Sequence, residues 1–305
     1  MPNTLTVTHA VGCSIRTPDT SGIPAALSAC SDADVVVLVL GDELPFIGEG
    51  HSTATLELLG GQRALLDALV ELGRPLVLVL VNSKPMVLPP RAAQVRAIVE
   101  CFNPGMEGGA ALAELLFGDL NPSGRLTISF PKHVGEQPSF YGQVRGQHGR
   151  EYADLDQIPR FSFGFGLSYT RFAYSGLRMS RSRLAATEPL EFELELENVG
   201  SREGTEVVQV YLSDLVTSVT WVTHALVAFQ RVTLAAGERR TLSFSIPYER
   251  LALVDAYERR VVEPGEFEIA VGAWSNDASA LRAKFIVTGD SFSFAGIPGA
   301  TTPRR

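Results

Sequence analysis

Three acidic residues and a histidine lie in the first half of the segment GDELPFIGEGHSTATLELLGGQ, residues 41–62, directly after a run of aliphatic residues. The acids are Asp42, Glu43 and Glu49, and His51 follows them. A carboxylic acid protonates a leaving group when burial raises its pKa, and a long loop that folds against another surface can provide such burial. Acids on a loop are also typical of solvated surface, so residue types alone leave both interpretations open.

Other catalytic patterns are weaker. His51 stands next to Ser52, but adjacent residues do not face each other productively, and no G-x-S-x-G elbow exposes a serine. The remaining histidines are scattered without metal-ligand spacing, so we expect no metal and no cofactor. The glycine-rich NPGMEGG, residues 103–109, opens a helix and is either an anion site or, by preference, a tight turn.

Buried strands and helices alternate around this loop. Residues 35–40 and 76–81 are continuous apolar runs that predict strands, the first covered on both faces. Residues 62–72 and 107–117 have helical periodicity, Ala97 starts a third strand, and 124–131 is a final extended piece. This order predicts an α/β sandwich with a mainly parallel sheet. Ligands bind at the carboxyl ends of such strands, where the loop after Leu40 begins.

The second half has a different period. LEFELELENVG alternates strictly, and EVVQVYLSD, RRTLSFSIP and GEFEIAVGAW repeat this pattern between turn signals. Such strands predict an all-β sandwich of the fibronectin type III or immunoglobulin-like kind. We therefore expect an α/β domain at residues 1–160, a β-sandwich at 161–288 and a loose tail at 289–305.

Composition narrows the partners and the compartment. The chain has 305 residues and a formal net charge of −8, without a basic patch, which argues against nucleic-acid binding. No apolar run is long enough to span a membrane. Cys13, Cys30 and Cys101 show no disulfide framework and indicate a reducing compartment. With no signal-peptide pattern at residues 1–12, we expect a cytoplasmic protein, and secretion remains the alternative for an N-terminally truncated chain.

Ordered landmarks run through most of the chain. They are ADVVVLVLGDE, LELLGGQRALLDAL, RPLVLVLVNSKP, AIVECFNPGMEGGAALAELLFGDLNPSGRLTISFPK, FSFGFGLSYTRFAYSGL and NVGSREGTEVVQVYL. From about Val11 to Val287 the chain resembles the C-terminal half of family 3 glycoside hydrolases, the β-glucosidase and β-xylosidase family. The resemblance implies the same fold: an α/β sandwich followed by a fibronectin type III-like domain.

The resemblance also implies roles for the loop residues. In the family, the sandwich lends an acid/base glutamate to a site on a preceding barrel, which carries the aspartate nucleophile. Counting back from LELLGGQ places this glutamate at Glu49, with Glu43 and His51 in supporting positions. The implied reaction is retaining hydrolysis of a β-linked glycoside or oligosaccharide, in which the glutamate protonates the leaving oxygen and later deprotonates water.

This sequence departs from the family pattern in three places. It contains no barrel, so we expect the isolated chain to be inactive or nearly so, and to need a barrel subunit or to self-associate. His51-Ser52-Thr53 replaces a stretch that often carries arginine, and Asn82-Ser83-Lys84-Pro85 replaces the common NGRP. Two other functions remain open: a non-catalytic accessory module that binds carbohydrate or protein, and a nucleotide-binding α/β domain, which the lack of phosphate motifs disfavours.

Overall fold

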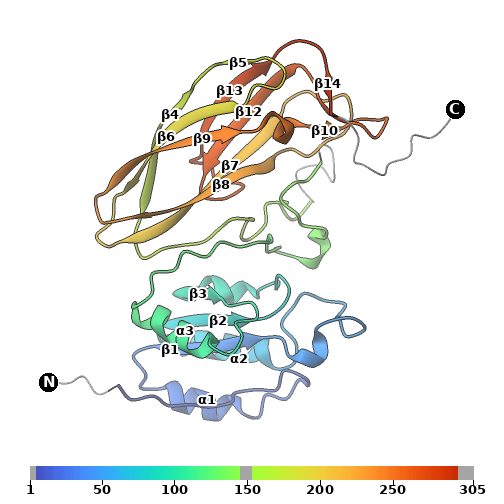
Figure 1. Cartoon of the computed structure of the whole chain (residues 1–305). Helices are drawn as coiled ribbons and strands as arrows, with labels where there is room; N and C mark the ends of the chain where they lie inside the picture. The colour runs from blue at the N-terminus through green and yellow to red at the C-terminus, as the bar shows by residue number, and fades with distance from the viewer. Residues whose placement is uncertain (1–4, 145–152, 295–305) are drawn as a thin grey trace. The chain divides into compact units, whose positions relative to one another are not determined.

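A computed structural model describes residues 5–144 and 153–294 of the chain. The chain divides into two compact units (Figure 1). Unit 1 comprises Met1–Phe117 with Phe130–Pro138, and unit 2 comprises Gly118–Ser129 with Ser139–Arg305. Residues 295–305 of the expected tail lie outside the described residues.

Unit 1 contains a parallel sheet of three strands in the order β1-β2-β3. The predicted alternation of strands and helices is confirmed, and with it the α/β class of this half. In chain order the elements are α1 (Ile23–Cys30), β1 (Val36–Gly41), η1 (Leu44–Phe46), α2 (Gln62–Glu71), β2 (Leu76–Val81), η2 (Pro90–Ala93), β3 (Ala97–Glu100), α3 (Gly108–Phe117) and η3 (Val134–Glu136). Leu65, Leu66 and Leu69 form the buried face of α2, as their helical spacing predicts.

The prediction that β1 is covered on both faces is wrong. Val36, Leu38 and Leu40 are buried, whereas Val37 is 44% and Val39 is 56% exposed. Successive side chains of a strand point to opposite faces, so one face of β1 packs in the core and the other meets solvent. A continuous run of valine and leucine is compatible with a strand covered on both faces and with a strand that has one exposed face. The run itself does not show whether another element packs on the second face.

Unit 2 is dominated by antiparallel strands, as predicted. A five-stranded sheet has the order β5-β13-β12-β7-β8, a three-stranded sheet the order β4-β6-β9, and a small sheet the order β10-β11-β14. The elements are β4 (Phe172–Met179), β5 (Arg183–Leu184), β6 (Leu190–Asn198), β7 (Gly204–Asp214), β8 (Ala225–Leu234), β9 (Arg239–Ile246), η4 (Tyr248–Leu251), β10 (Leu253–Val254), β11 (Arg260–Val262), β12 (Gly265–Gly272), β13 (Leu281–Val287) and β14 (Phe292–Ser293).

The alternation in β6 builds the core of unit 2. Leu190, Phe192, Leu194 and Leu196 are at most 1% exposed, while Glu193 between them is exposed. These side chains belong to one apolar cluster that also includes Phe267 and other inward-facing residues of β7 and β12. The period of two therefore predicts correctly which face of this strand is buried.

The extended piece expected at residues 124–131 joins unit 2 in its first part. Leu126 accepts a backbone hydrogen bond from Gly164 at 2.7 Å and donates one to Phe165 at 2.9 Å. Arg125 forms an ion pair with Glu206 of β7, at 2.6 Å between Nη2 and Oε1, and both side chains are buried. Residues 118–129 are thus held on the β-sandwich by a charge pair and by backbone pairing.

Candidate active-site loop

The loop with the predicted catalytic residues begins where β1 ends, and Gln62 fixes both of its ends. The Gln62 side chain is fully buried at the start of α2. Its Oε1 accepts a hydrogen bond from the Gly41 N–H at 2.7 Å, and its Nε2 donates to the Gly41 carbonyl at 2.9 Å. A Cβ at Gly41 would collide with the Val81 carbonyl oxygen of β2. Glycine therefore lets the two strand ends approach before the chain turns away.

Glu49 lies in an exposed turn of this loop. Gly48 and Gly50 on either side have φ values of 100° and 74°, which L-residues rarely adopt. Nothing lies within 4 Å of the Cβ that either glycine would carry. Among the described residues, the Glu49 side chain makes no hydrogen bond or ion pair. The structure thus places this carboxylate in solvent, free to contact another molecule.

The two supporting residues lie on the same loop but do not bond to Glu49. Glu43 pairs with Arg16, at 2.6 Å between Oε2 and Nε, and the Arg16 side chain is 63% exposed. His51 is exposed, and its backbone N–H donates to the Gly48 carbonyl at 3.1 Å. The three predicted site residues therefore lie on one loop because they are close in sequence, and no hydrogen bond or ion pair that the structure describes joins their side chains. Their roles in catalysis stay predictions.

Sequence reasoning missed the buried charge at the root of the loop. Asp42 received no role from the sequence, yet its side chain is only 1% exposed and Lys84 Nζ lies 3.4 Å from its Oδ2. Lys84 also donates a hydrogen bond to Oγ1 of Thr53, at the far side of the loop. The sequence did contain a signal for this ion pair: an acid closely follows one predicted strand, and a lysine closely follows the next strand. Parallel strands end at the same edge of a sheet, so the two side chains can meet there.

The neighbouring strand ends are also polar. Asn82 follows β2, is fully buried and donates from Nδ2 to Oε2 of Glu100 at 3.1 Å. The Phe102 N–H donates to the other carboxylate oxygen at 2.8 Å. Burial raises the pKa of Glu100, and these two hydrogen bonds oppose the rise. Phe102 itself has a φ of 48°, a strained value for an aromatic residue. This network belongs to the support of the sheet edge.

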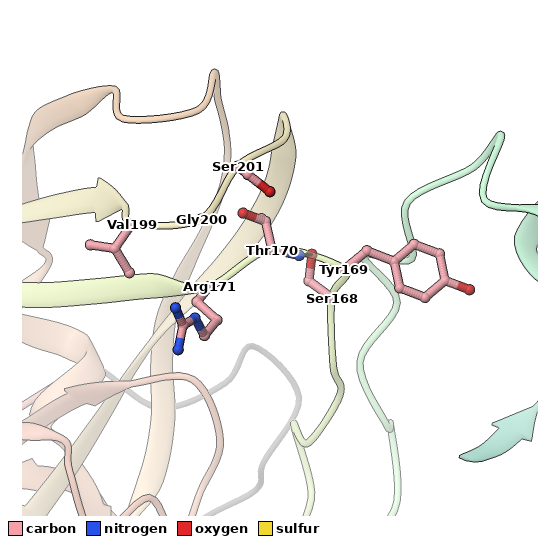
Figure 2. Close-up of a pocket in the computed structure, with 7 residues that line it drawn as sticks. All are labelled: Ser168, Tyr169, Thr170, Arg171, Val199, Gly200 and Ser201. Carbon is pink, nitrogen blue, oxygen red and sulfur yellow. Dashed lines mark hydrogen bonds between the residues drawn. The ribbon is translucent and has the colours of Figure 1, made fainter. Parts of the chain in front are cut away.

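A separate pocket lies in unit 2 (Figure 2). It has a volume of about 480 Å³ and is lined by Ser168, Tyr169, Thr170, Arg171, Val199, Gly200 and Ser201. Thr170 Oγ1 donates to Asn198 at 2.6 Å and Ser168 Oγ to Asn121 at 2.9 Å, so both hydroxyls are used by the fold. Figure 2 shows the Tyr169 ring pointing away from Arg171. The pocket contains no carboxylate and none of the predicted site residues.

Residues 5–144 and 153–294 contain no group of three or more His, Cys, Asp or Glu that could hold a metal ion. In the same ranges no helix is both long and apolar enough to cross a membrane.

Family models match both halves of the chain. Residues 2–169 match the glycosyl hydrolase family 3 C-terminal domain, and residues 206–275 match a fibronectin type III-like domain. The second match agrees with the antiparallel sheets of unit 2.

Two relatives of the chain are glycosidases by name. A β-xylosidase of Formosa agariphila is 39% identical over 283 residues, which are 90% of this chain and 38% of that protein. A periplasmic β-glucosidase of Salmonella typhimurium is 37% identical over 260 residues, 82% of this chain and 34% of that protein. The chain thus spans little more than a third of the length of these relatives.

Solved structures agree with the sequence relatives. A β-glucosidase of intestinal bacteria involved in saponin metabolism is 43% identical, with a TM-score of 0.86 over 90% of this chain and 39% of that one. A β-glucosidase of Listeria innocua, solved with glucose, is 32% identical, with a TM-score of 0.84 over 91% of this chain and 40% of that one. The chain therefore belongs to glycosyl hydrolase family 3, of which it carries the C-terminal domain followed by a fibronectin type III-like domain.

Proposed function

We propose that this chain supplies Glu49 as the general acid/base for retaining hydrolysis of β-glycosides, with the nucleophile coming from a barrel domain or subunit. The observation that carries the proposal is the position of Glu49. It is exposed between two glycines, without a partner among the described residues, on the loop that leaves the carboxyl end of β1. Ligands of open α/β sheets bind outside this edge.

The chemistry requires a second carboxylate close to Glu49. In a retaining enzyme one carboxylate attacks the anomeric carbon while the other acid protonates the departing oxygen, and the two are about 5 Å apart. Glu49 then removes a proton from the water that releases the sugar from the first carboxylate. The other two acids near Glu49 have partners of their own, since Glu43 pairs with Arg16 and Asp42 is buried beside Lys84, so we assign the nucleophile to the barrel component.

An exposed apolar surface on unit 1 supports the need for another polypeptide. Val35, Val37 and Val39 of the β1 segment are 56%, 44% and 56% exposed, all on one side of the strand. Contiguous exposed apolar side chains mark surfaces that bind protein. We therefore propose that this face contacts the barrel component or, in its absence, a second copy of the chain.

A second function, carbohydrate binding without catalysis, is favoured by the pocket of unit 2. Arg171 on its rim is exposed and makes no ion pair within the described part of the chain, so its guanidinium is free to donate hydrogen bonds to sugar hydroxyls. Titration with a β-linked disaccharide, followed by chemical shifts of residues 168–171 and 199–201, tests this function. Shifts that persist in Arg171→Ala would contradict it.

Complementation tests the catalytic proposal. The chain is assayed on an aryl β-glucoside alone, and then mixed with the barrel part of a family 3 β-glucosidase. We expect no hydrolysis by either component alone and measurable hydrolysis by the mixture. Hydrolysis by the chain alone would contradict the need for a barrel, and an inactive mixture whose components bind would contradict the acid/base assignment to this chain.

A further inference from the structure

Lys84 contacts the loop that carries Glu49 on both sides of this residue. Its Nζ lies 3.4 Å from Oδ2 of Asp42, where the loop leaves β1. The same nitrogen donates to Oγ1 of Thr53, which follows Glu49 in the chain. We infer that Lys84 is a positioning residue, which holds the loop at the carboxyl edge of the sheet on both sides of Glu49 and so determines where Glu49 is presented. The inference rests on the function proposed for Glu49.

The first contact is required by burial. The Asp42 side chain is 1% exposed, and neither carboxylate oxygen has a hydrogen-bond partner among the described residues. A buried carboxylate without a counter-charge is strongly unfavourable, so the Lys84 ammonium group compensates a charge that the sheet edge has removed from water. Lys84 is 20% exposed, and its neighbour Asn82 is fixed by a backbone hydrogen bond from its N–H to the Phe102 carbonyl at 3.1 Å.

The second contact matters because residues 43–53, the part of the loop around Glu49, have few other anchors. The hydrogen bonds of residues 44–52 that the structure describes all lie within the loop or at its root, such as Phe46 N–H to Glu43 O at 2.9 Å and His51 N–H to Gly48 O at 3.1 Å. Apart from Lys84, one exposed ion pair, between Glu43 and Arg16, joins residues 43–53 to another segment. The next anchor along the chain is the Leu56 carbonyl, which accepts a hydrogen bond from the Val87 N–H at 2.8 Å. Exposed ion pairs contribute little to stability.

The arrangement separates two effects of Lys84. Neutralising Asp42 stabilises the fold, whereas the bond to Thr53 restrains the loop. Substitution of Thr53 by valine removes the second contact, together with the hydrogen bond from Thr53 Oγ1 to the Thr55 carbonyl at 2.8 Å, and leaves the buried ion pair intact. Substitution of both Asp42 and Lys84 by apolar residues removes the energetic cost of burying the carboxylate as well as the restraint on the loop.

Amide hydrogen exchange of the full chain, followed by mass spectrometry, tests the inference. In Thr53→Val we expect exchange in residues 43–52 to accelerate by about tenfold, because local opening becomes easier, while the melting temperature stays at the wild-type value. Lys84→Met should accelerate the same segment and also lower the melting temperature. Lys84→Arg should retain most of the protection. The matched control is Lys284→Met, which removes a surface ion pair with Glu266 in unit 2.

The double variant Asp42→Leu/Lys84→Met distinguishes restraint of the loop by Lys84 from a general effect of Lys84 on the stability of the fold. We expect it to recover the melting temperature but to keep the fast exchange of residues 43–52. Wild-type exchange in this segment for both Thr53→Val and the double variant would overturn the inference. Because the readout needs no catalysis, its failure is distinct from a failure of complementation, which tests the proposed function.

Discussion

Gln62 and Gly41 are joined by two hydrogen bonds, one in each direction, between the side-chain amide and the backbone. The pair lies at the junction of β1, the loop and α2. Gly41 is the last residue of β1, and the Gln62 side chain of α2 forms the two hydrogen bonds with it that a neighbouring strand would otherwise form. The loop therefore starts and ends at positions that the core of unit 1 fixes.

Gln62→Leu should destabilise unit 1. The substitution leaves the buried N–H and carbonyl of Gly41 without the side-chain partners, which costs about 3 kcal/mol in the free energy of unfolding. Denaturant unfolding measures the loss. Gln94→Leu is the matched control, because Gln94 is exposed and surface substitutions change stability by about 0.5 kcal/mol or less. Equal free energies of unfolding for the two variants would show that these hydrogen bonds do not contribute to stability.

Arg125→Met should destabilise unit 2 in a pH-dependent manner. The ion pair with Glu206 is buried, and removal of one partner of such a pair costs about 3–5 kcal/mol. Burial raises the pKa of Glu206 and the Arg125 charge opposes this rise, so the substitution raises that pKa further.

The sign of the pH effect follows from the raised pKa. A glutamate in the unfolded chain has a pKa of about 4.3. Above this pH and below the folded pKa, the folded variant holds a proton on Glu206 that the unfolded chain has released, so acidification stabilises it. The deficit relative to wild type should therefore be largest at neutral pH and shrink as the pH falls toward about 5, as urea unfolding at several pH values measures. A deficit that grows on acidification would contradict this explanation.

Val37→Lys/Val39→Lys should weaken binding of a second polypeptide to unit 1. Both side chains are substantially exposed, so the charges are expected to leave the melting temperature nearly unchanged. Analytical ultracentrifugation, with and without a family 3 barrel component, should show at least about tenfold weaker association, because the charges must be desolvated on binding. Val216→Lys, at an exposed valine of unit 2, is the control. Unchanged association in the double variant would exclude this face as the interface.

The sequence predicts the elements of this protein better than their long-range contacts. Helical spacing of Leu65, Leu66 and Leu69 and alternation in β6 directly encode which face is buried, so these predictions are confirmed. The second face of β1 is different, since its exposure depends on what packs against it. Arg125 and Glu206 are far apart in the chain, and no local pattern predicts their ion pair. For Asp42 and Lys84 the sequence offers only their positions after two parallel strands, which does not specify the contact. The family landmarks locate the loop, but its anchors emerge only from the fold.

Glu49→Ala, measured in the complex with a barrel component, tests the central claim most directly. We expect a loss of about 10²–10⁴-fold in kcat on a glycoside with a poor leaving group, the usual contribution of general acid–base catalysis. On a substrate with an activated leaving group, azide should restore turnover, because an external nucleophile replaces the water that Glu49 would deprotonate. Glu114→Ala, at an exposed glutamate of α3, should keep wild-type activity. Full activity of Glu49→Ala in this complex would contradict the account.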